Sequence, residues 1–236
     1  MLKPQEDELK KISPALQQIK ETNDNIERNI AFLTEQNEEL KKKVEQLEVG
    51  NRKDKEYILL LEDKLENMQK ESRKRNIEIK NVPFNGKESK DDLLQIVTKL
   101  SENIDCNMAQ TNVMDIYRIR GKKQEENAPI IVEMSSTMLK DNFLKKCKEH
   151  NIKNRNNKLS AKHLGHTKNE NTPIYVSEHL TAKAARLRFL ASDLTKSKGY
   201  AFCWTNIGRV FVRKSENSPV ILINNEAQVN RLMQEA

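Results

Sequence analysis

The sequence predicts a long N-terminal parallel coiled coil followed by a basic α+β region, and three observations lead to this fold class. Apolar residues repeat in a strict heptad over about the first third of the 236 residues, as in coiled coils. Beyond that third, short alternating segments are interleaved with amphipathic ones. Charged residues make up 33% of the chain and aromatic residues only 5%, which argues against one large globular domain.

The heptad keeps its register from Leu9 to about residue 72, over about nine repeats. Position a holds Leu9, Leu16, Asn23, Ile30, Asn37, Val44, Asn51, Ile58, Leu65 and Ser72. Ser13 and Pro14 resemble an N-cap and a first helical residue, so we expect the helix to begin there and to extend on the order of 90 Å. The pattern therefore predicts an N-terminal tail over residues 1–13 and a coiled coil over residues 14–74.

Polar residues within the heptad bear on how the helices would associate. An Asn at position a pairs with its counterpart only in a parallel, in-register assembly, and it favours a dimer. The segment 43–48 resembles a motif associated with trimers, with Lys in place of Arg, so both stoichiometries remain open. The candidate oligomerisation residues are Asn23, Asn37, Lys43, Val44, Leu47, Glu48 and Asn51.

The second region reads as two small domains. Residues 75–178 are expected to hold strands at 76–82, 112–119, 129–134 and 173–176, with helices beginning at Ser89 and Thr137. This β-α-β-β-α-β order is shared by ferredoxin-like folds and RNA-recognition motifs, so we predict an RNA-recognition-motif-like domain. Residues 179–236 are expected to form a small α/β domain, with a helix from Thr181, a hairpin over 200–213, a strand over 220–223 and a terminal helix.

Charge is distributed unevenly along the chain. Residues 1–72 carry 13 Lys and Arg against 17 Asp and Glu, a net of −4, which leaves 29 against 18, a net of +11, for residues 73–236. Such a basic region favours a polyanionic partner, with nucleic acid ahead of a membrane surface, although an ordinary solvated surface is the alternative. The candidate binding residues are Arg73, Arg75, Arg118, Arg120, Lys122, Lys123, Lys145, Lys146, Arg155, Lys158, Lys198, Arg209, Arg213 and Lys214.

The segment Lys198–Phe202 matches the first five positions of the RNP1 pattern of RNA-recognition motifs. Strand alternation would put Tyr200, Phe202 and Trp204 on one face, which either stacks on unpaired bases or packs in the core. In an RNA-recognition motif this pattern lies on the third strand, which corresponds here to residues 129–134, and those residues include no aromatic side chain. The alternative is a helix-ending Gly followed by a hairpin with core aromatics.

No catalytic motif is present, so we expect no enzyme activity and no cofactor. Cys147-x2-His150-x12-His163-x2-His166 has a spacing similar to a zinc finger, but chance explains it better, and we expect no metal. No stretch approaches the ~20 apolar residues that span a bilayer. Three widely spaced cysteines suit reduced thiols, and the start has no apolar core of a signal peptide, so we expect an intracellular protein, cytoplasmic, nuclear or both.

Five segments together resemble a known family. They are Arg73–Ile79, Asp115–Arg118, Pro129–Val132, Ile174–Thr181 and Trp204-x3-Gly208-x-Val-Phe-Val-Arg213-Lys214. In order and spacing, over residues 73–223, they resemble the few-polyhedra (FP) proteins of baculoviruses and insect genomes. Those proteins are relatives of the first-open-reading-frame protein of LINE-type retrotransposons.

The resemblance implies a coiled-coil trimer with an atypical RNA-recognition motif, a small FP-like C-terminal domain and nucleic-acid chaperone activity on single strands. It also implies that Arg118, Arg120 and Arg186 contact RNA. The resulting hypothesis is a non-enzymatic oligomer, with a parallel trimer slightly favoured over a dimer, that binds single-stranded RNA or DNA with little sequence preference. The alternatives are a scaffold protein of viral FP type that binds other proteins, and a metal-dependent, sequence-specific DNA-binding protein.

Overall fold

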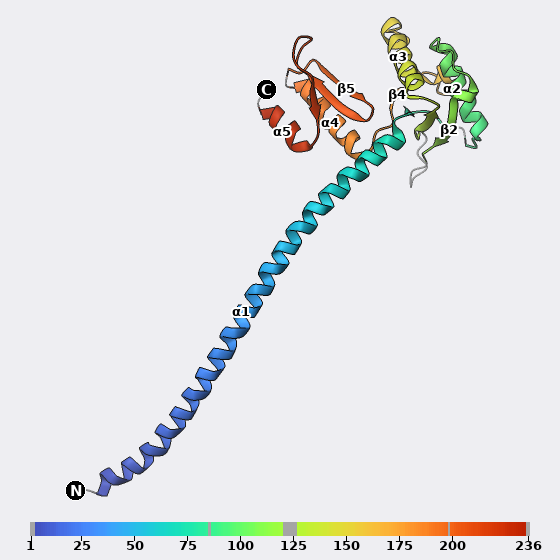
Figure 1. The fold of residues 1–236 in the computed structure, drawn as a ribbon. Helices are drawn as coiled ribbons and strands as arrows, with labels where there is room; N and C mark the ends of the chain where they lie inside the picture. Colours follow the sequence, from blue (N-terminus) through green and yellow to red (C-terminus); the bar gives the residue numbers. More distant parts are fainter. Residues whose placement is uncertain (1–2, 85, 120–126, 198, 235–236) are drawn as a thin grey trace. The chain divides into compact units, whose positions relative to one another are not determined.

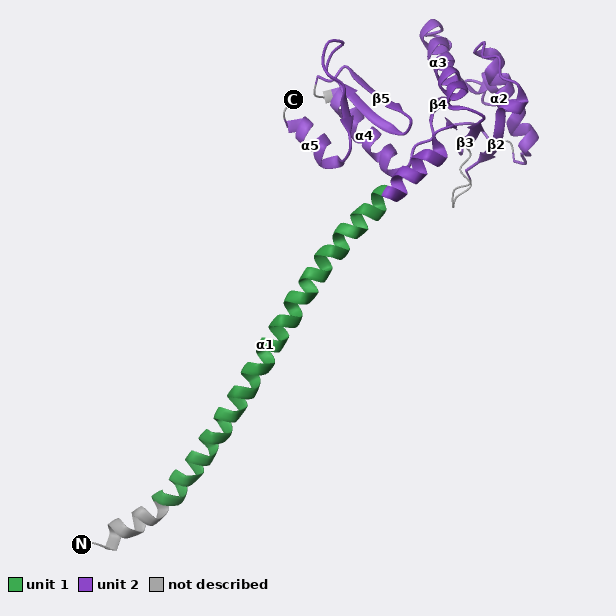
Figure 2. Ribbon diagram, in the orientation of Figure 1, with its two compact units in different colours: residues 1–63 green, residues 64–236 purple. Residues whose placement is uncertain are grey.

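The computed structural model describes residues 3–84, 86–119, 127–197 and 199–234, with side chains described from Ile12 onward except that of Ser197. The chain divides into two compact units, residues 1–63 and 64–236 (Figures 1 and 2). The first unit consists of most of helix α1, Lys3–Arg73. The second unit contains the end of that helix and two antiparallel sheets with their helices, an α+β arrangement.

Helix α1 is continuous over 71 residues, as the heptad predicted, but it begins earlier than expected. Pro14 lies inside the helix, so the prediction that Ser13 and Pro14 mark its start is wrong. Pro14 lacks the N–H that would donate to the carbonyl four residues earlier, so one intrahelical hydrogen bond is lost. The helical turns on both sides of Pro14 nevertheless continue through this position.

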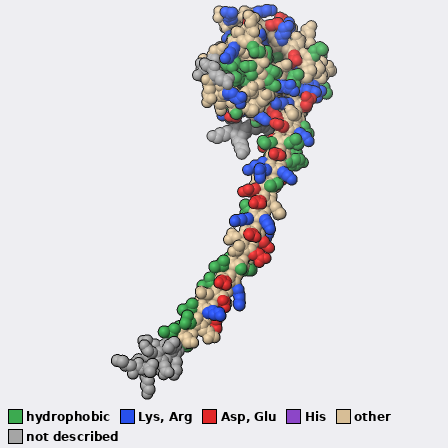
Figure 3. Space-filling model, turned by 60° about the vertical axis from the view of Figure 1, so that its left-hand side comes forward, with side chains coloured by type: hydrophobic (Ala, Val, Ile, Leu, Met, Phe, Trp, Pro, Cys, Tyr) green, Lys and Arg blue, Asp and Glu red, His purple; other side chains and the backbone are tan. Residues whose placement is uncertain are grey.

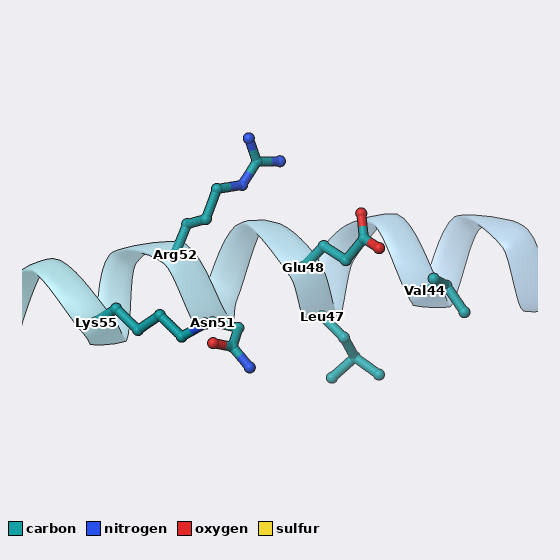
Figure 4. Close-up of a pocket in the computed structure, with 6 residues that line it drawn as sticks. All are labelled: Val44, Leu47, Glu48, Asn51, Arg52 and Lys55. Carbon is teal, nitrogen blue, oxygen red and sulfur yellow. The ribbon is translucent and has the colours of Figure 1, made fainter.

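From Ile12 onward, the large apolar side chains of α1 are exposed in the single chain (Figure 3). Leu47, at position d, is 72% exposed. Figure 4 shows Val44, Leu47 and Asn51 on one side of the helix, while Glu48 and Arg52 extend to the other side. A helix that exposes such a stripe gains stability when the stripe is buried against another apolar surface.

The first sheet has four antiparallel strands in the order β2-β3-β1-β4. The strands are β1 Asn76–Lys80, β2 Val113–Arg118, β3 Ile130–Met134 and β4 Tyr175–Glu178. Helices α2 (Lys90–Asn103) and α3 (Thr137–Lys153) contribute to the core beside one face, as Figure 1 shows, and short 3-10 turns lie at Gln110–Asn112 and Ala161–Leu164. The predicted strands and helices are present in order, although β4 begins two residues later than expected.

Local sequence signals account for these helices and their packing. Ser89 and Asp92 form the predicted capping box at the start of α2, and Ser136 caps α3. Alternation on β1 directs Ile77 and Ile79 into the core, where they meet the apolar faces of both helices. The opposite face of the same strand carries Glu78 and Lys80, which form an ion pair of 3.2 Å.

The second sheet has three antiparallel strands in the order β5-β6-β7. Its strands are β5 Phe202–Asn206, β6 Arg209–Arg213 and β7 Ile221–Ile223, and its helices are α4 Ala182–Ser197 and α5 Glu226–Gln234. Its core joins Leu187 and Leu194 of α4 and Val229 of α5 to Val210 and Val212 of β6, so both helices pack on the same inner face of the sheet. Among the described residues, no helix combines the length and apolar character needed to cross a membrane.

The stability of the folded protein is expected to fall in mild acid because burial lowers the pKa of His163, His166 and His179, that of His179 to about 4. A folded-state pKa below the unfolded value near 6.5 means that the unfolded chain binds more protons, so stability present above pH ~6.5 is lost toward pH ~4. The temperature at the midpoint of thermal unfolding should therefore decrease when the pH is lowered from 7 to 5. His179→Gln should make this fall smaller, and an equally steep fall in that variant would contradict the assignment.

Candidate nucleic-acid interface

A buried carboxylate joins three elements of the second unit. Glu178, the last residue of β4, accepts a 2.6 Å hydrogen bond on Oε1 from Lys140 Nζ of α3. The same carboxylate accepts the backbone N–H groups of Ile207 at 2.9 Å and Gly208 at 3.4 Å, from the turn between β5 and β6. The end of the first sheet therefore holds both α3 and the tip of the hairpin.

Both charges of this pair are buried, since Lys140 is 1% exposed and Glu178 is 7% exposed. Burial alone would raise the pKa of Glu178, but the hydrogen bond and charge of Lys140, with donors from the hairpin, hold the pKa below its usual value. Ile207 and Gly208 both have positive φ, 49° and 69°, which suits a two-residue hairpin turn but is unusual for the β-branched Ile207. The Ile207 N–H that this conformation presents is bonded to Glu178.

The outer face of the β5–β6 hairpin combines rings with cations. Strand pairing sets Trp204 opposite Phe211 and Phe202 opposite Arg213, while the intervening Val210 and Val212 are buried on the inner face. The rings of Trp204 and Phe211 are stacked, with centroids 5.6 Å apart and planes 18° from parallel. Arg209 shares the strand face of Phe211 and Arg213, because alternate residues of a strand point to the same side.

A groove of about 280 Å³ lies between α3 and this hairpin. Its residues come from both sides and from the end of β4: Asp141, Leu144, Lys145, Lys148, Glu178, Trp204, Thr205 and Asn206. The groove thus sets an indole beside two ammonium groups, one of which, Lys145, is largely exposed and lies 3.9 Å from Glu149. Such an arrangement can stack a flat base and neutralise a phosphate at the same time.

Arg118 has a structural role, which corrects the expectation that it contacts RNA. Its side chain is 7% exposed and forms a two-pronged ion pair with Glu88, with N–O distances of 2.7 and 2.8 Å. The remaining guanidinium N–H groups donate to the carbonyls of Val82, Pro83 and Ala128, so all five donors are used. Strand alternation carries the missed signal, because Arg118 shares the inward face of β2 with the buried Ile116.

Tyr200 is not available to stack on bases as one expectation had it, since it is 3% exposed and belongs to the core beside α4. It lies before β5, so it does not share the outer face with Phe202 and Trp204 as predicted. Gly199 has a φ of 72°, which fits the alternative reading of a helix-ending Gly followed by a core aromatic. The ammonium of Lys214 lies over the Tyr200 ring, 5.3 Å from its centroid.

The other candidate residues divide between engaged, exposed and undescribed positions. Arg73 donates to the Leu180 carbonyl, Arg75 pairs with Glu133, Arg186 with Glu226, and Arg213 donates through Nε to the Ser218 carbonyl. Arg155, Lys158 and Arg209 are exposed. The positive charge of Lys146 opposes the rise in the pKa of the Cys106 thiol that burial causes, and Lys146 is not among the residues that line the groove. Arg120, Lys122, Lys123 and Lys198 lie outside the described residues. The structure therefore brings Lys145 and Trp204 together and adds Lys148.

The zinc-like spacing corresponds to a partly buried cluster. The rings of His150 and His163 meet edge to face with centroids 5.1 Å apart, and the Ser160 N–H donates to His163 Nδ1. Burial raises the pKa of the Cys147 thiol to about 12, which disfavours the thiolate that metal binding needs. Over the described ranges, no group of three or more His, Cys, Asp or Glu side chains is arranged to hold a metal ion.

Comparison with known proteins supports the FP-like part of the resemblance. Residues 181–233 match the family model described as Baculovirus FP protein domain 2. This segment begins at the residue before α4 and includes the hairpin that forms one side of the groove. A search of curated proteins finds no match to the chain.

Removing the Glu178 charge should strongly destabilise the second unit because it leaves Lys140 buried without a carboxylate. We expect Glu178→Gln to lower the free energy of unfolding by about 3–5 kcal/mol, and Lys140→Met in the same chain to restore part of that loss. Chemical denaturation measures both changes, with the exposed Glu216→Gln as the matched control. A loss below about 1 kcal/mol, the scale of an exposed pair, would contradict the role assigned to this ion pair.

Proposed function

We propose that the protein is a non-enzymatic oligomer that binds single-stranded nucleic acid, RNA foremost, with little sequence preference. The groove between α3 and the hairpin carries this proposal, because it combines the Trp204 ring, which stacks on Phe211, with Lys145 and Lys148. Stacking of unpaired bases on aromatic rings is worth ~1–3 kcal/mol per base and tolerates every base. Lysine contacts to phosphates add affinity that depends on salt and not on sequence.

The first sheet supports an RNA-recognition-motif-like domain that is atypical in where it would bind. Its chain order, β-α-β-β-α-β, and its sheet order suit that interpretation. The face turned away from α2 and α3 carries Glu78 and Glu133 on its two central strands, and these carboxylates pair with Lys80 and Arg75, so those two cations are already engaged. In the groove, Lys148 and the largely exposed Lys145 lie beside Trp204, which makes the groove the better candidate.

The exposed stripe of α1 supports self-association through a parallel coiled coil. Most of its a and d side chains are apolar and exposed, and Asn23, Asn37 and Asn51 at position a favour in-register pairing. We favour a trimer slightly over a dimer, on the resemblance alone. Several copies of the second unit, linked through the coiled coil, raise the local concentration of weak binding sites, so that modest contacts sum to useful avidity. Many weak contacts of this kind would suit a nucleic-acid chaperone derived from an insect virus or a retrotransposon relative.

A scaffold role is the second candidate function, and the match of residues 181–233 to a baculovirus FP domain favours it. In that case the coiled coil and the C-terminal domain would bind other proteins in place of nucleic acid. The scaffold hypothesis predicts a stoichiometric complex with a protein partner and only generic affinity, with a Kd of ~10⁻⁴ M or weaker, for every nucleic acid at physiological salt.

Binding should respond differently to loss of the groove's cations and of its indole. In fluorescence anisotropy titrations of the full chain with a single-stranded RNA across a salt series, Lys145→Ala with Lys148→Ala should weaken binding and reduce the salt slope by about 1–2. Trp204→Leu should weaken binding by roughly 5- to 100-fold with the slope unchanged, because stacking releases no counterions.

The control is Lys162→Ala with Lys168→Ala, which removes two exposed cations elsewhere and should leave affinity almost unchanged. Equal-length single-stranded DNA and duplex DNA complete the comparison, and the duplex should bind more weakly than either single strand. Groove variants that bind like this control, or a duplex that binds as tightly as RNA, would refute the proposed site.

Disrupting the coiled coil should separate the chains, and with them their second units, and so reduce avidity. Leu47→Asp puts a charge at position d, so the mass measured by light scattering should fall from two or three chains toward 27.4 kDa. Affinity for long single strands should fall with it, whereas Glu45→Gln at position b should change neither. An unsubstituted protein of 27.4 kDa at micromolar concentration would contradict the coiled-coil assignment.

A further inference from the structure

The last turns of α1 contact the segment that leads into the C-terminal domain. Glu66 is buried although most of the described side chains of this helix are exposed. Its Oε1 accepts a 2.7 Å hydrogen bond from the hydroxyl of Thr181, which is itself fully buried. A buried carboxylate on an otherwise solvated helix needs such a donor, so this contact is a specific one.

Thr181 also determines where α4 begins. Its hydroxyl oxygen accepts from the Ala184 N–H at 3.1 Å, and its carbonyl accepts from the Ala185 N–H at 2.8 Å, so Thr181 is the N-cap of α4. One hydroxyl thus donates to Glu66 and accepts from α4. The Glu66 carboxylate lies near the positive end of the α4 dipole, which adds a favourable charge interaction.

Two further residues of α1 extend the contact. Arg73 Nη1 donates to the Leu180 carbonyl at 2.6 Å, one residue before the cap. Lys70 Nζ lies 3.2 Å from Glu66 Oε1. The Lys70 side chain also packs against the hairpin turn, so closely that a Cβ added at Gly208 would lie 3.2 Å from Lys70 Cγ. The same turn donates to Glu178, so the hairpin tip is held from both sides.

These contacts leave the side chains at heptad positions a and d of the helix exposed. Glu66 and Arg73 occupy heptad position b and Lys70 position f, which lie away from positions a and d. On the a and d side, Leu65 is 56% exposed and Met68 is 70% exposed. The end of α1 can therefore pack in a coiled coil and hold the C-terminal domain simultaneously.

We infer that Glu66, Lys70 and Arg73 are positioning residues that fix the hairpin against α3 and so set the nucleic-acid groove. This inference rests on the proposed function. Loss of these contacts should shift the hairpin relative to α3 and weaken strand binding, while positions a and d stay free for self-association.

Two variants that both lose the Thr181–Glu66 hydrogen bond test this inference in the full chain. Glu66→Ala and Thr181→Val should each weaken binding of a single-stranded RNA by roughly 5-fold or more, with the oligomeric mass unchanged. The losses should be less than additive in the double variant because both substitutions remove one shared hydrogen bond, while Glu66→Ala also removes the Lys70 ion pair and Thr181→Val also removes the bond to the Ala184 N–H. Thr181→Ser keeps the hydroxyl, and Glu56→Ala removes an exposed carboxylate at position f of the same helix, so both should behave like the unsubstituted protein.

The groove itself has a built-in probe, since Trp204 is the only tryptophan of the chain. With 5-fluorotryptophan incorporated, the ¹⁹F signal of Trp204 should shift in Glu66→Ala and Thr181→Val without nucleic acid, and stay in place in the two controls. An unshifted signal in both variants would overturn the inference whatever the affinities. A shifted signal in a protein that binds no strand at all would uphold the positioning role and refute the proposed function.

Discussion

The arrangement of the second unit depends on one buried ion pair, Glu178 with Lys140. Neither charge reaches bulk water, so each needs the other, and the carboxylate takes its remaining hydrogen bonds from the hairpin turn. The unusual positive φ of Ile207 is tolerated where its N–H is bonded to that carboxylate. The position of the β5–β6 hairpin relative to α3 therefore follows from satisfying a charge that the fold has buried.

This constraint links fold to function through the groove. Glu178 lies at the groove and neutralises Lys140, while Lys145 and Lys148, further along the same helix, line the groove with Trp204. On the other side of the hairpin, the end of α1 holds the cap of α4 and the turn. One helix thus carries both an exposed apolar stripe and a polar face that contacts the hairpin beside the groove, and the proposed function would use the stripe for self-association and the groove for strand binding.

Short-range patterns predicted most of the elements and fewer of the site residues. The heptad, the capping box at Ser89 and the alternation of Ile77 and Ile79 all act within a few residues and were readable from the sequence. Glu178 and Lys140 are 38 residues apart, and no local rule pairs them. One hint was available, because Lys140 lies on the same helical face as Phe143 and Cys147, where a buried lysine requires a carboxylate partner. The charge of Arg118 suggests a binding residue, whereas its position on the inward face of β2, beside the buried Ile116, indicates a buried one.

The most direct test of the account is the intrinsic fluorescence of Trp204 during titration with a single-stranded RNA. Because this single indole lines the groove, a base stacked on it should quench the emission in a saturable way. The quenching curve should coincide with the binding curve measured by anisotropy on the labelled strand. Binding that leaves Trp204 emission unchanged would show that the strand is held elsewhere and would contradict the assignment of the groove.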